Sequence, residues 1–425
     1  MQYEKKNIPI LFILNHFYPE VGAIRTEYQL ARTLGNYGDR ITVVTTYPRE
    51  YRMPELLCRI LGDHYKRKKG LIYEKIGRIL VYRIPSYVGK SDTLSSRLLE
   101  IIFSVPLLLV AGVIASLREK PDVIITGGDI ESVVTLAAYP LKFFLRKRIL
   151  TILHDIHSSV LVDLGLIKEG SITHKLIKFL EILLFRIADA IVVHSPSNKT
   201  FILKKYNKPS KVHVIFLWAD IKKVKPIQDK EQCPFKNKFV IYYGGVLSYA
   251  QVPEVIIEAA KVIAKRGYSD ILFLIVGDGP EKPKLVEKAE KERLKNIIFK
   301  SFVPWEKHVE FLRCSDIGLV TLKKNYKQPV VPSKLIEIMS AGVVPLLSIP
   351  AHNDAKKIAV DLAKAGIWVK PEDPEALADA IISLYENKEL LELLKKRARK
   401  FAEEHFSLEK NAHRYRQLIL RLIEK

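Results

Sequence analysis

Short apolar runs alternate along the chain with longer segments whose apolar residues recur every three or four positions. The short runs have the length and composition of buried strands, and the longer segments have the period of amphipathic helices. In the first half the predicted strands are Pro9–Asn15, Arg40–Thr46, Ile79–Ile84, Asp122–Thr126, Arg148–Leu153, Ala190–His194 and Val212–Phe216. Because strands that alternate with helices form βαβ units, this half is predicted to build a parallel sheet covered by helices.

The alternation stops between Asp220 and Lys238, where the sequence is rich in lysine, proline and glutamine and shows no period. It then restarts. The predicted strands of the second half are Phe239–Tyr243, Ile271–Val276, Asn296–Lys300, Ile317–Thr321, Val343–Leu347 and Gly366–Val369. The last stretch, Ser407–Glu424, opens with a serine that can cap a helix and carries apolar residues at helical spacing.

The predicted fold is therefore α/β, with two Rossmann-like parallel-sheet domains that face a central cleft. Ligands of such sheets bind at the carboxyl ends of the strands, so functional residues are expected there. The expected parts are a first domain over residues 1–220, a linker over 221–238, a second domain over 239–406, and a C-terminal helix over 407–425 that returns to the first domain.

The composition is that of a globular protein, with 425 residues of which 48% are hydrophobic. The three cysteines, Cys58, Cys233 and Cys314, lie far apart and form no CxxC pair, so neither a disulfide framework nor a zinc site is expected. The polar start, Met1–Lys6, leads straight into a strand and differs from a secretion signal. These features favour a reducing cytoplasm as the location.

Lysine and arginine total 69 against 47 acidic residues, a formal charge of +22. Such an excess favours anionic partners, which include phosphates, nucleic acid and acidic lipid headgroups. The basic runs lack the interleaved aromatic residues of a single-strand nucleic-acid groove, so they are interpreted as solvated faces and no nucleic acid is expected.

One segment, Leu98–Leu117, is almost entirely apolar but contains Glu100 and Pro106 and leads directly into a predicted strand. It is predicted to be a helix that is buried or that touches a bilayer, rather than one that crosses it. Together with the basic and apolar stretch Lys175–Arg186, it predicts peripheral contact with an anionic membrane, at the cytoplasmic face of the cell membrane.

A glycine-containing loop follows the first predicted strand and reads Pro19-Glu20-Val21-Gly22-Ala23-Ile24-Arg25 before a helix begins. The N-terminus of a helix offers free backbone amides and a positive dipole end. A diphosphate is therefore predicted to rest against Gly22 and Ala23, with Arg25 nearby. An ordinary turn between strand and helix is the alternative.

The second domain repeats this arrangement after its first strand. Gly244 and Gly245 can bring backbone amides close to an anion, while Ser248 and Gln251 supply uncharged hydrogen-bonding groups. A further turn, Gly277-Asp278-Gly279-Pro280, follows the next strand. Gly277 and Gly279 are counted with the phosphate site, and a tight turn with a structural role alone is the alternative.

The segment Pro332–Gly342 carries the most informative polar residues. Ser333 is predicted to cap a short helix that Gly342 ends. Ser333 and the free amides of the helix are suited to hold phosphate, and Lys334 is suited to neutralise it. Glu337, one turn further on, is suited to accept hydrogen bonds from ribose hydroxyls.

Titratable side chains follow the strand Arg148–Leu153, in the order His154-Asp155-Ile156-His157. His154 and Asp155 are candidates to orient an acceptor hydroxyl or the donor sugar, and a structural hydrogen-bond cluster is the alternative. The sequence contains no Asp-x-Asp motif, so neither a metal nor another cofactor is expected.

These combinations resemble glycosyltransferase family 4, retaining enzymes with the two-Rossmann GT-B fold, and the resemblance runs essentially end to end. Pro19-Glu20 with Gly22 resembles the family's first phosphate loop. Gly277–Pro280 resembles its G-x-G-P turn, and Pro332–Gly342 with Pro345 resembles its donor-binding segment, which includes Leu335 beside Ser333, Lys334 and Glu337. His154 and Asp155 fall in a segment that resembles the family's acceptor-side His/Asp segment.

Within the family, Tyr249-Ala250-Gln251 looks most like a branch that adds amino- or deoxysugars during polysaccharide, O-antigen and capsule assembly. The chain also departs from the family. Many members carry an arginine and a lysine where this chain has Val246 and Gln251, and Pro329 stands where the first of two paired glutamates is usual. Lys334, Arg25 and backbone amides remain to stabilise the leaving diphosphate.

The resemblance implies a metal-independent hexosyl- or other glycosyltransferase. The donor would be a nucleoside-diphosphate sugar, with UDP or GDP as the nucleotide and its base held by backbone groups near Ser301–Val303, those of Val303 included. The acceptor would be a carbohydrate or a lipid-linked precursor. Two alternatives stay open: a GT-B epimerase that acts on a sugar nucleotide, and a degenerate, non-catalytic homologue that binds phosphate or nucleic acid.

Overall fold

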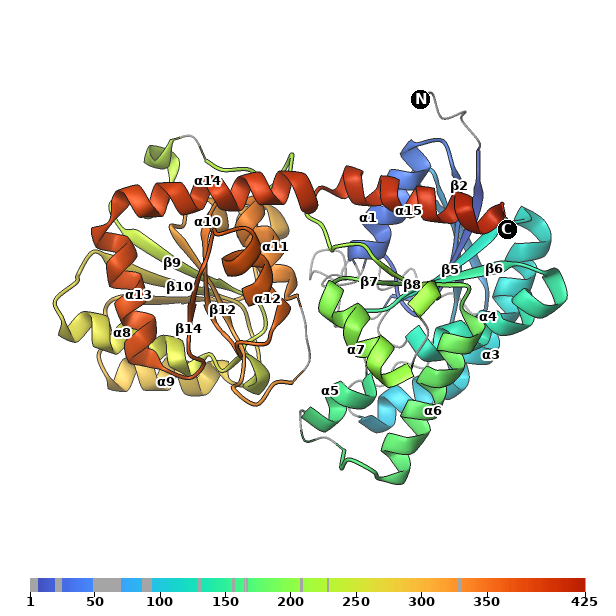
Figure 1. The fold of residues 1–425 in the computed structure, drawn as a ribbon, viewed down its shortest axis with the longest axis horizontal. Helices are drawn as coiled ribbons and strands as arrows, with labels where there is room; N and C mark the ends of the chain where they lie inside the picture. Colours follow the sequence, from blue (N-terminus) through green and yellow to red (C-terminus); the bar gives the residue numbers. More distant parts are fainter. Residues whose placement is uncertain are drawn as a thin grey trace. The chain divides into compact units, whose positions relative to one another are not determined.

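The computed structural model describes residues 7–19, 25–48, 70–85, 94–127, 131–154, 157–163, 165, 167–206, 209–227, 229–327 and 331–424. The chain divides into two compact units, one formed by Met1–Phe216 with Leu408–Lys425 and the other by Leu217–Ser407. Each unit contains a mainly parallel sheet covered by helices (Figure 1). The predicted α/β fold with two Rossmann-like sheets is confirmed.

The first unit holds an eight-stranded sheet in the order β3-β4-β2-β1-β5-β6-β7-β8. Its strands are β1 (Pro9–Leu14), β2 (Arg40–Thr46), β3 (Ile72–Ile76), β4 (Ile79–Ile84), β5 (Val123–Gly127), β6 (Arg148–Ile152), β7 (Ala190–Val193) and β8 (Val212–Val214). The central strands are buried on both faces, which is why continuous apolar runs rather than alternating patterns mark them in the sequence.

Strand β3 was not predicted from the sequence. It is an edge strand that pairs antiparallel with β4, and its residues alternate between buried and more exposed positions, so no apolar run marks it. The two strands are joined at Gly77-Arg78, and Gly77 has a φ of +59°. A glycine in a two-residue connection between strands is a hairpin signal, and it was available in the sequence.

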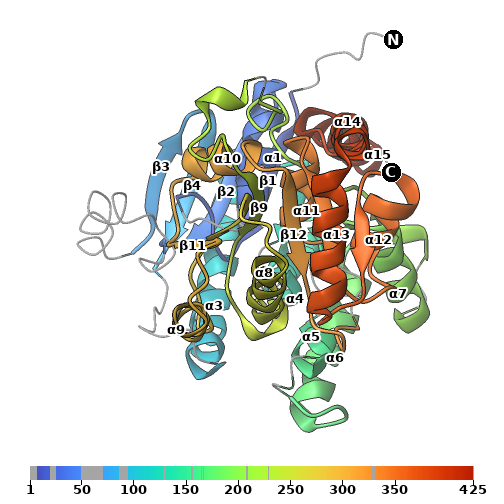
Figure 2. The same cartoon turned by 90° about the vertical axis from the view of Figure 1, so that its left-hand side faces the viewer.

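The helices of the first unit lie on both faces of its sheet. They are α1 (Arg25–Asn36), α3 (Leu94–Glu119), α4 (Glu131–Leu145), α5 (His157–Asp163), α6 (Ile172–Ile187), α7 (Pro196–Tyr206), the single turn η2 (Pro209–Lys211) and α15 (Leu408–Ile423). Helices α3, α4 and α6 lie side by side, whereas α1 and α15 cover the opposite face (Figures 1 and 2). Within the part of the chain that is described, no helix has the length and apolarity needed to span a bilayer.

The C-terminal helix α15 is fastened to the first unit by an ion pair. Arg416 donates to both carboxylate oxygens of Asp39, at 2.9 Å from Nε and 3.2 Å from Nη2. Asp39 also accepts a hydrogen bond from the backbone N–H of Ile8 at 3.1 Å, and its side chain is fully buried. A bidentate pair of this kind fixes both position and orientation, so α15 is held beside the start of β1 and the end of α1.

The second unit holds a six-stranded parallel sheet in the order β11-β10-β9-β12-β13-β14. Its strands are β9 (Phe239–Gly244), β10 (Ile271–Val276), β11 (Ile297–Lys300), β12 (Ile317–Thr321), β13 (Val344–Ser348) and β14 (Ile367–Val369). The order is that of a doubly wound sheet, in which the chain leaves β9 in one direction and later continues from β12 in the other. The ligand crevice of such a sheet lies at this reversal, outside the carboxyl ends of β9 and β12.

Helices cover both faces of this second sheet. They are η3 (Lys230–Gln232), η4 (Tyr249–Gln251), α8 (Glu254–Lys265), α9 (Lys282–Lys291), α10 (Trp305–Arg313), α11 (Ser333–Ser340), α12 (Asp354–Lys356), η5 (Lys357–Leu362), α13 (Pro374–Glu386) and α14 (Lys388–His405). Helices α8 and α13 lie side by side on one face (Figure 2). Buried aliphatic residues of β9, β10, β12 and both of these helices form one continuous core.

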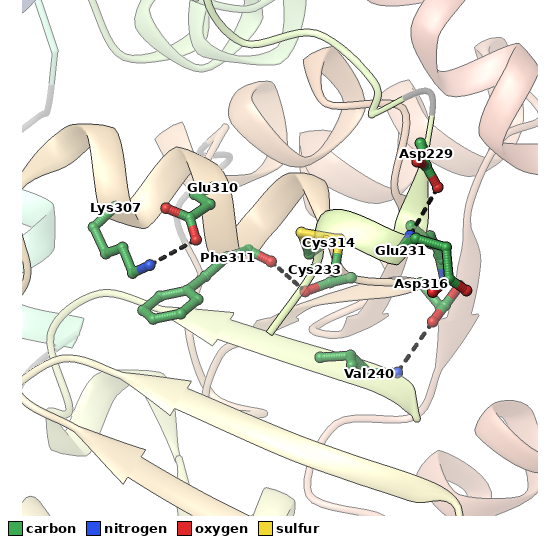
Figure 3. The surroundings of a disulfide bond; sticks show 11 residues. Asp229, Glu231, Cys233, Val240, Lys307, Glu310, Phe311, Cys314 and Asp316 are labelled. Carbon is green, nitrogen blue, oxygen red and sulfur yellow. Dashed lines mark hydrogen bonds and ion pairs between the residues drawn. A yellow bond between two sulfur atoms is a disulfide. The ribbon is translucent and has the colours of Figure 1, made fainter. Parts of the chain in front are cut away.

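Cys233 and Cys314 form a disulfide bond, with Cα atoms 5.6 Å apart and positions that are 81 apart in the sequence (Figure 3). The expectation that the cysteines are unpaired was therefore wrong. No local spacing of cysteines in the sequence predicts this disulfide, because one cysteine lies before β9 and the other follows α10. Disulfides occur in oxidising compartments and in intracellular proteins of hyperthermophiles, so the cysteines no longer support a reducing location.

The segment predicted as a linker is anchored on the second unit by polar contacts. Asp316 accepts hydrogen bonds from Lys230 and, at 3.1 Å, from Lys395 Nζ. It also accepts one from the backbone N–H of Val240 at 3.1 Å (Figure 3). Arg399 of α14 donates to the backbone carbonyls of Ile221 and Val224. These contacts and the disulfide hold residues 221–238 against the end of the second sheet.

Candidate functional site

The loop after β9 is tied to the loop after β12 at the reversal of strand order in the second unit. Thr321, the last residue of β12, donates from its hydroxyl to the backbone carbonyl of Gln251. The backbone N–H of Lys323 donates to the carbonyl of Ala250 at 3.1 Å. These two bonds hold η4 beside the end of β12, at the sheet edge where the sequence predicts a phosphate site.

Lys334, in the first turn of α11, lies directly against the glycine loop. Its Nζ donates to Oε1 of Gln251 at 2.9 Å and lies 4.1 Å from the ring centre of buried Tyr243. A Cβ added to Gly245 would lie 3.5 Å from Nζ, within ordinary contact of the ammonium group, and the φ of +133° at Gly245 is one that residues with a side chain rarely adopt. The structure thus brings Lys334, Gly245 and Gln251 together.

Burial also changes the acidity of Lys334. Desolvation lowers the pKa of its ammonium group to about 7, because the charged form loses water while Gln251 offers only a neutral oxygen. An anion beside Nζ would favour the charged form and raise this pKa again. The arrangement is therefore suited to bind a phosphate and to couple that binding to proton uptake.

Glu337, one turn after Lys334, is held by a chain of side-chain hydrogen bonds that was not predicted from the sequence. His308 Nε2 lies 2.9 Å from Oε2 of Glu337, and His308 Nδ1 lies 2.6 Å from the hydroxyl of Tyr242. Burial, and next the charge of Glu337, raise the pKa of Tyr242. Tyr242 therefore keeps its proton and donates to Nδ1, which leaves Nε2–H to donate to the carboxylate.

Gly244 leaves space for the rings of this hydrogen-bond chain. A Cβ at this position would lie 2.7 Å from Cε1 of Tyr242 and 3.0 Å from Cε1 of His308. The absence of a side chain at Gly244 is thus explained by two aromatic rings of the same unit. A tyrosine two residues before the glycine, on the same side of the strand, was the available sequence signal.

The glycines of the turn after β10 fasten two loops to each other. A Cβ on Gly277 would overlap the carbonyl oxygen of Gly245, and one on Gly279 would overlap that of Leu247. The backbone N–H of Leu247 in turn donates to the carbonyl of Asp278 at 2.9 Å. These contacts favour the structural alternative for Gly277 and Gly279, which shape the glycine loop from behind.

The start of α11 differs from the prediction by one residue. The N-cap position is held by Pro332, whose carbonyl accepts a hydrogen bond from the N–H of Leu335 at 2.9 Å, and Ser333 is the first helical residue. Ser333 is exposed, whereas the side chain of Leu335 is buried in the core. Gly342 follows the helix with a φ of +67° and ends it as predicted.

Two other predicted donor-site residues lie around the same sheet edge. Ser248 precedes η4 and is half-buried. Val303 follows β11 and is also half-buried, next to Phe302, whose N–H donates to Oδ2 of Asp278 at 2.8 Å. Burial acts to raise the pKa of Asp278, but hydrogen bonds from Lys282 and from the Phe302 N–H outweigh it, so the pKa of Asp278 is lowered. The backbone near Val303 is thus fixed by a charged group.

In the first unit, His154 belongs to a buried chain of hydrogen bonds at the carboxyl ends of β6 and β7. His154 Nε2 lies 2.6 Å from Oε1 of Glu27 in α1, and His154 Nδ1 lies 3.1 Å from Nε2 of His194. His194 Nδ1 lies 3.1 Å from the carbonyl oxygen of Ile215. Glu27 and His194 were not identified from the sequence, since both are far from His154 along the chain.

The groups that form this chain of hydrogen bonds determine which nitrogens of His154 and His194 carry protons. Burial, followed by the charge of His154, lowers the pKa of His194 to about 3, so His194 is neutral. A carbonyl only accepts, so His194 donates from Nδ1 and accepts at Nε2 from His154 Nδ1–H. His154 then needs a second proton on Nε2 to face the carboxylate of Glu27. The geometry therefore makes His154 an imidazolium paired with Glu27.

The remaining predicted residues are not described. Gly22, Ala23 and Asp155 lie outside the described residues, and so does Pro329. Arg25 is the first residue of α1, but its side chain also lies outside the described part. The first phosphate loop therefore stays a prediction from the sequence.

Residues 224–401 match the protein family described as glycosyl transferases group 1. Over 274 residues the chain is 27% identical to an uncharacterized glycosyltransferase, MJ1069, of Methanocaldococcus jannaschii. The aligned region covers 64% of this chain and 68% of that protein. Over 382 residues it is 26% identical to WcaI of Escherichia coli K12, a putative colanic acid biosynthesis glycosyl transferase. This alignment covers 86% of this chain and 89% of that protein.

Two solved structures are similar over nearly the whole chain. Sucrose-phosphate synthase from Thermosynechococcus elongatus superposes with a TM-score of 0.75 at 16% identity, over 98% of this chain and 99% of that one. Anabaena HepE in complex with UDP superposes with a TM-score of 0.71 at 17% identity, over 97% of this chain and 100% of that one. These similarities show that the chain has the GT-B fold.

Proposed function

We propose that the protein is a glycosyltransferase that moves a sugar from a nucleoside-diphosphate sugar to a carbohydrate or lipid-linked acceptor, with retention of configuration. The observation that carries the proposal is the cluster of Lys334, Gly245 and Gln251 at the reversal of strand order. A cation, a glycine loop and a helix N-terminus meet there, as a diphosphate requires. The whole cluster lies within the segment that matches the glycosyl transferases group 1 family.

The second unit is assigned to the donor. The diphosphate contacts Lys334 and the backbone amides of the glycine loop, Glu337 accepts hydrogen bonds from the ribose, and the base contacts the backbone near Val303. Anabaena HepE, which has the same fold, forms complexes with UDP and with UDP-glucose. This similarity supports UDP as the nucleotide.

The chemical role of Lys334 follows from the charge that develops during transfer. When the bond between sugar and phosphate breaks, negative charge accumulates on the leaving phosphate oxygen. A protonated Lys334 stabilises this charge, and it does so strongly in a site with little water. The proposed reaction uses no metal ion, because the ammonium group and the helix amides carry the compensating charge.

His154 is assigned to the acceptor side as a fixed positive charge. Both of its ring nitrogens donate, to Glu27 and to His194, so the ring has no lone pair available to act as a base. The proton of the acceptor hydroxyl is therefore taken up by the leaving phosphate oxygen, and His154 contributes electrostatically or by orienting the sugar.

Calorimetric titration with UDP, GDP, ADP and dTDP, each with EDTA or with magnesium, tests the donor assignment. UDP is expected to bind in both conditions. Lys334→Ala is expected to weaken UDP binding by about 10- to 100-fold, as for a lost hydrogen bond to a charged group. Lys284→Ala is the matched control, because Lys284 is an exposed lysine of α9.

Three outcomes would contradict the proposal. Absence of binding to every nucleotide would favour a degenerate homologue, and steeply salt-dependent binding to nucleic acid without turnover would favour a binding protein. Release of an epimerised or free sugar without a glycoside product would favour a sugar-nucleotide epimerase.

A further inference from the structure

Three adjacent helices of the first unit expose large apolar side chains on the side that faces away from the sheet. Helix α3 exposes Phe103 and Val110, with exposed fractions of 52% and 55%. Helix α4 exposes Phe143 and Phe144, at 69% and 77%, and α6 exposes Ile172 and Phe179, at 87% and 55%. These six residues define what we call the apolar face (α3, α4 and α6 in Figure 1).

The same helices already bury an apolar side against the sheet. On α3, Leu108, Ala111 and Ala115 belong to the core of the first unit, and on α4 so do Val134 and Leu141. A surface helix of a globular protein normally places polar residues opposite its buried side. Helices that are apolar on both sides mark a surface that contacts something other than water.

Basic residues outnumber acidic residues around the apolar face. Arg118, Arg146 and Lys175 are exposed on or next to these helices. Two acidic residues of these helices are engaged elsewhere: Glu119 accepts from the hydroxyl of Tyr82 at 3.0 Å, and buried Glu181 accepts from the backbone N–H of Ser158 at 2.8 Å. Glu169, just before α6, is an exposed acidic residue. The described part of this surface is thus apolar and predominantly basic.

We propose that the apolar face docks on the surface of an anionic phospholipid membrane. The phenylalanine and aliphatic side chains insert among the lipid headgroups, and the arginine and lysine side chains contact lipid phosphates. A second copy of the chain is a poorer occupant, because two apolar faces brought together would oppose basic residues of like charge. The proposal stands independently of the proposed function, since it requires neither a nucleotide nor an acceptor.

Flotation of the full chain with vesicles tests the proposal. Vesicles of phosphatidylcholine containing about 30% phosphatidylglycerol are expected to carry the protein upward, while vesicles of phosphatidylcholine alone carry much less, because each basic residue contributes about fivefold on an anionic surface. Raising the salt concentration is expected to weaken the binding. Equal binding to both vesicle types, or binding to neither, would overturn the proposal.

Matched variants identify the surface. Phe143→Ser with Phe144→Ser is expected to reduce the vesicle-bound fraction at least tenfold, since two exposed aromatic side chains are lost. Leu362→Ser with Leu393→Ser is the apolar control, because these residues of the second unit are 56% and 44% exposed. Circular dichroism and thermal unfolding establish that both proteins fold. If the Leu362→Ser, Leu393→Ser protein lost as much vesicle binding as the Phe143→Ser, Phe144→Ser protein, the assignment of the apolar face as the membrane contact would be overturned.

A second pair of variants examines the charge. Arg146→Glu with Lys175→Glu is expected to reduce binding to the anionic vesicles by more than tenfold, and Lys396→Glu with Lys400→Glu, exposed residues of α14, is expected to leave it unchanged. Sedimentation velocity measures self-association of the same proteins. Concentration-dependent dimers that disappear in the Phe143→Ser, Phe144→Ser protein would identify a second copy as the occupant and overturn the membrane proposal.

Discussion

His154 Nε2 lies 2.6 Å from Oε1 of Glu27, a carboxylate that is only 2% exposed. Because neutral His194 occupies the other ring nitrogen as an acceptor, a proton must lie between His154 and Glu27. A buried carboxylate thus keeps this histidine charged. The pair explains why a histidine at the end of β6 holds a fixed positive charge rather than acting as a base.

Glu27→Gln is expected to weaken the hold on this proton, because the amide does not compensate the positive ring. Activity of the variant should fall on the alkaline side of the pH profile, by about tenfold or more at a pH one unit above the midpoint for proton loss. The check is the pH dependence of kcat/KM. In a His154→Ala background the same change should have no further effect, and an additive loss would contradict the coupling.

Binding of a nucleotide sugar is expected to take up a proton through Lys334. The pKa of this lysine is lowered to about 7 by burial, and a diphosphate beside it raises the pKa again. Affinity should therefore fall by up to about tenfold per pH unit above pH 7. Calorimetry of a UDP-sugar in buffers of different ionisation enthalpy measures the proton uptake, and Lys334→Met should abolish it.

The same lysine gives a pH dependence of stability. Its pKa in the folded protein lies below the ordinary value of 10.5, so the unfolded chain binds more protons between pH 7 and 10.5. The free energy of unfolding should therefore gain a contribution that rises with pH across this window, and Lys334→Met should remove it. Urea unfolding at several pH values is the measurement, and identical slopes for both proteins would contradict the assignment.

His308 is expected to position Glu337 for the ribose. Glu337→Gln should weaken UDP binding by about 5- to 100-fold. His308→Ala should weaken it less, because the carboxylate of Glu337 keeps its charge and loses only its fixed orientation. Both variants should discriminate less between UDP and 2′-deoxy-UDP. Unchanged discrimination in His308→Ala, together with normal folding, would assign His308 a structural role alone.

Gly277→Ala is expected to destabilise the second unit by about 3 kcal/mol or more, because the new methyl group meets the backbone of Gly245 as well as an unfavourable φ. Gly267 is the matched control. It also has a positive φ, +85°, but no atom lies within 4 Å of the place that a new methyl group would take. Gly267→Ala should therefore cost only about 1–2 kcal/mol, as measured by chemical denaturation.

The disulfide closes a long loop within the second unit, and its removal is expected to lower the free energy of unfolding by about 2–5 kcal/mol. Cys233→Ser, Cys314→Ser and the double variant should lose similar amounts, since each removes the same bond. Thiol titration of the unfolded wild-type chain should detect one free cysteine before reduction and three after it, because the chain has three cysteines and two of them are paired. Additive losses in the double variant would contradict the pairing.

The apolar runs of the sequence predict every strand of the two sheets except the edge strand β3, within one or two residues at most ends. A buried parallel strand needs an uninterrupted apolar run, and such a run is a local property. The sequence also located Lys334 and Glu337 on one short helix and Gly342 at the end of that helix. Helical spacing and the conformational preference of glycine are likewise local.

The contacts between side chains, in contrast, follow from the fold and not from local patterns. The contacts of His308 with Tyr242, of Glu27 with His154, and of Cys233 with Cys314 join residues that are 66, 127 and 81 positions apart. Their distances depend on the order of strands in the sheets and on which loops follow neighbouring strands, and no periodicity along the chain encodes that order. The residue types were visible in the sequence, but their protonation states and partners follow only from the fold.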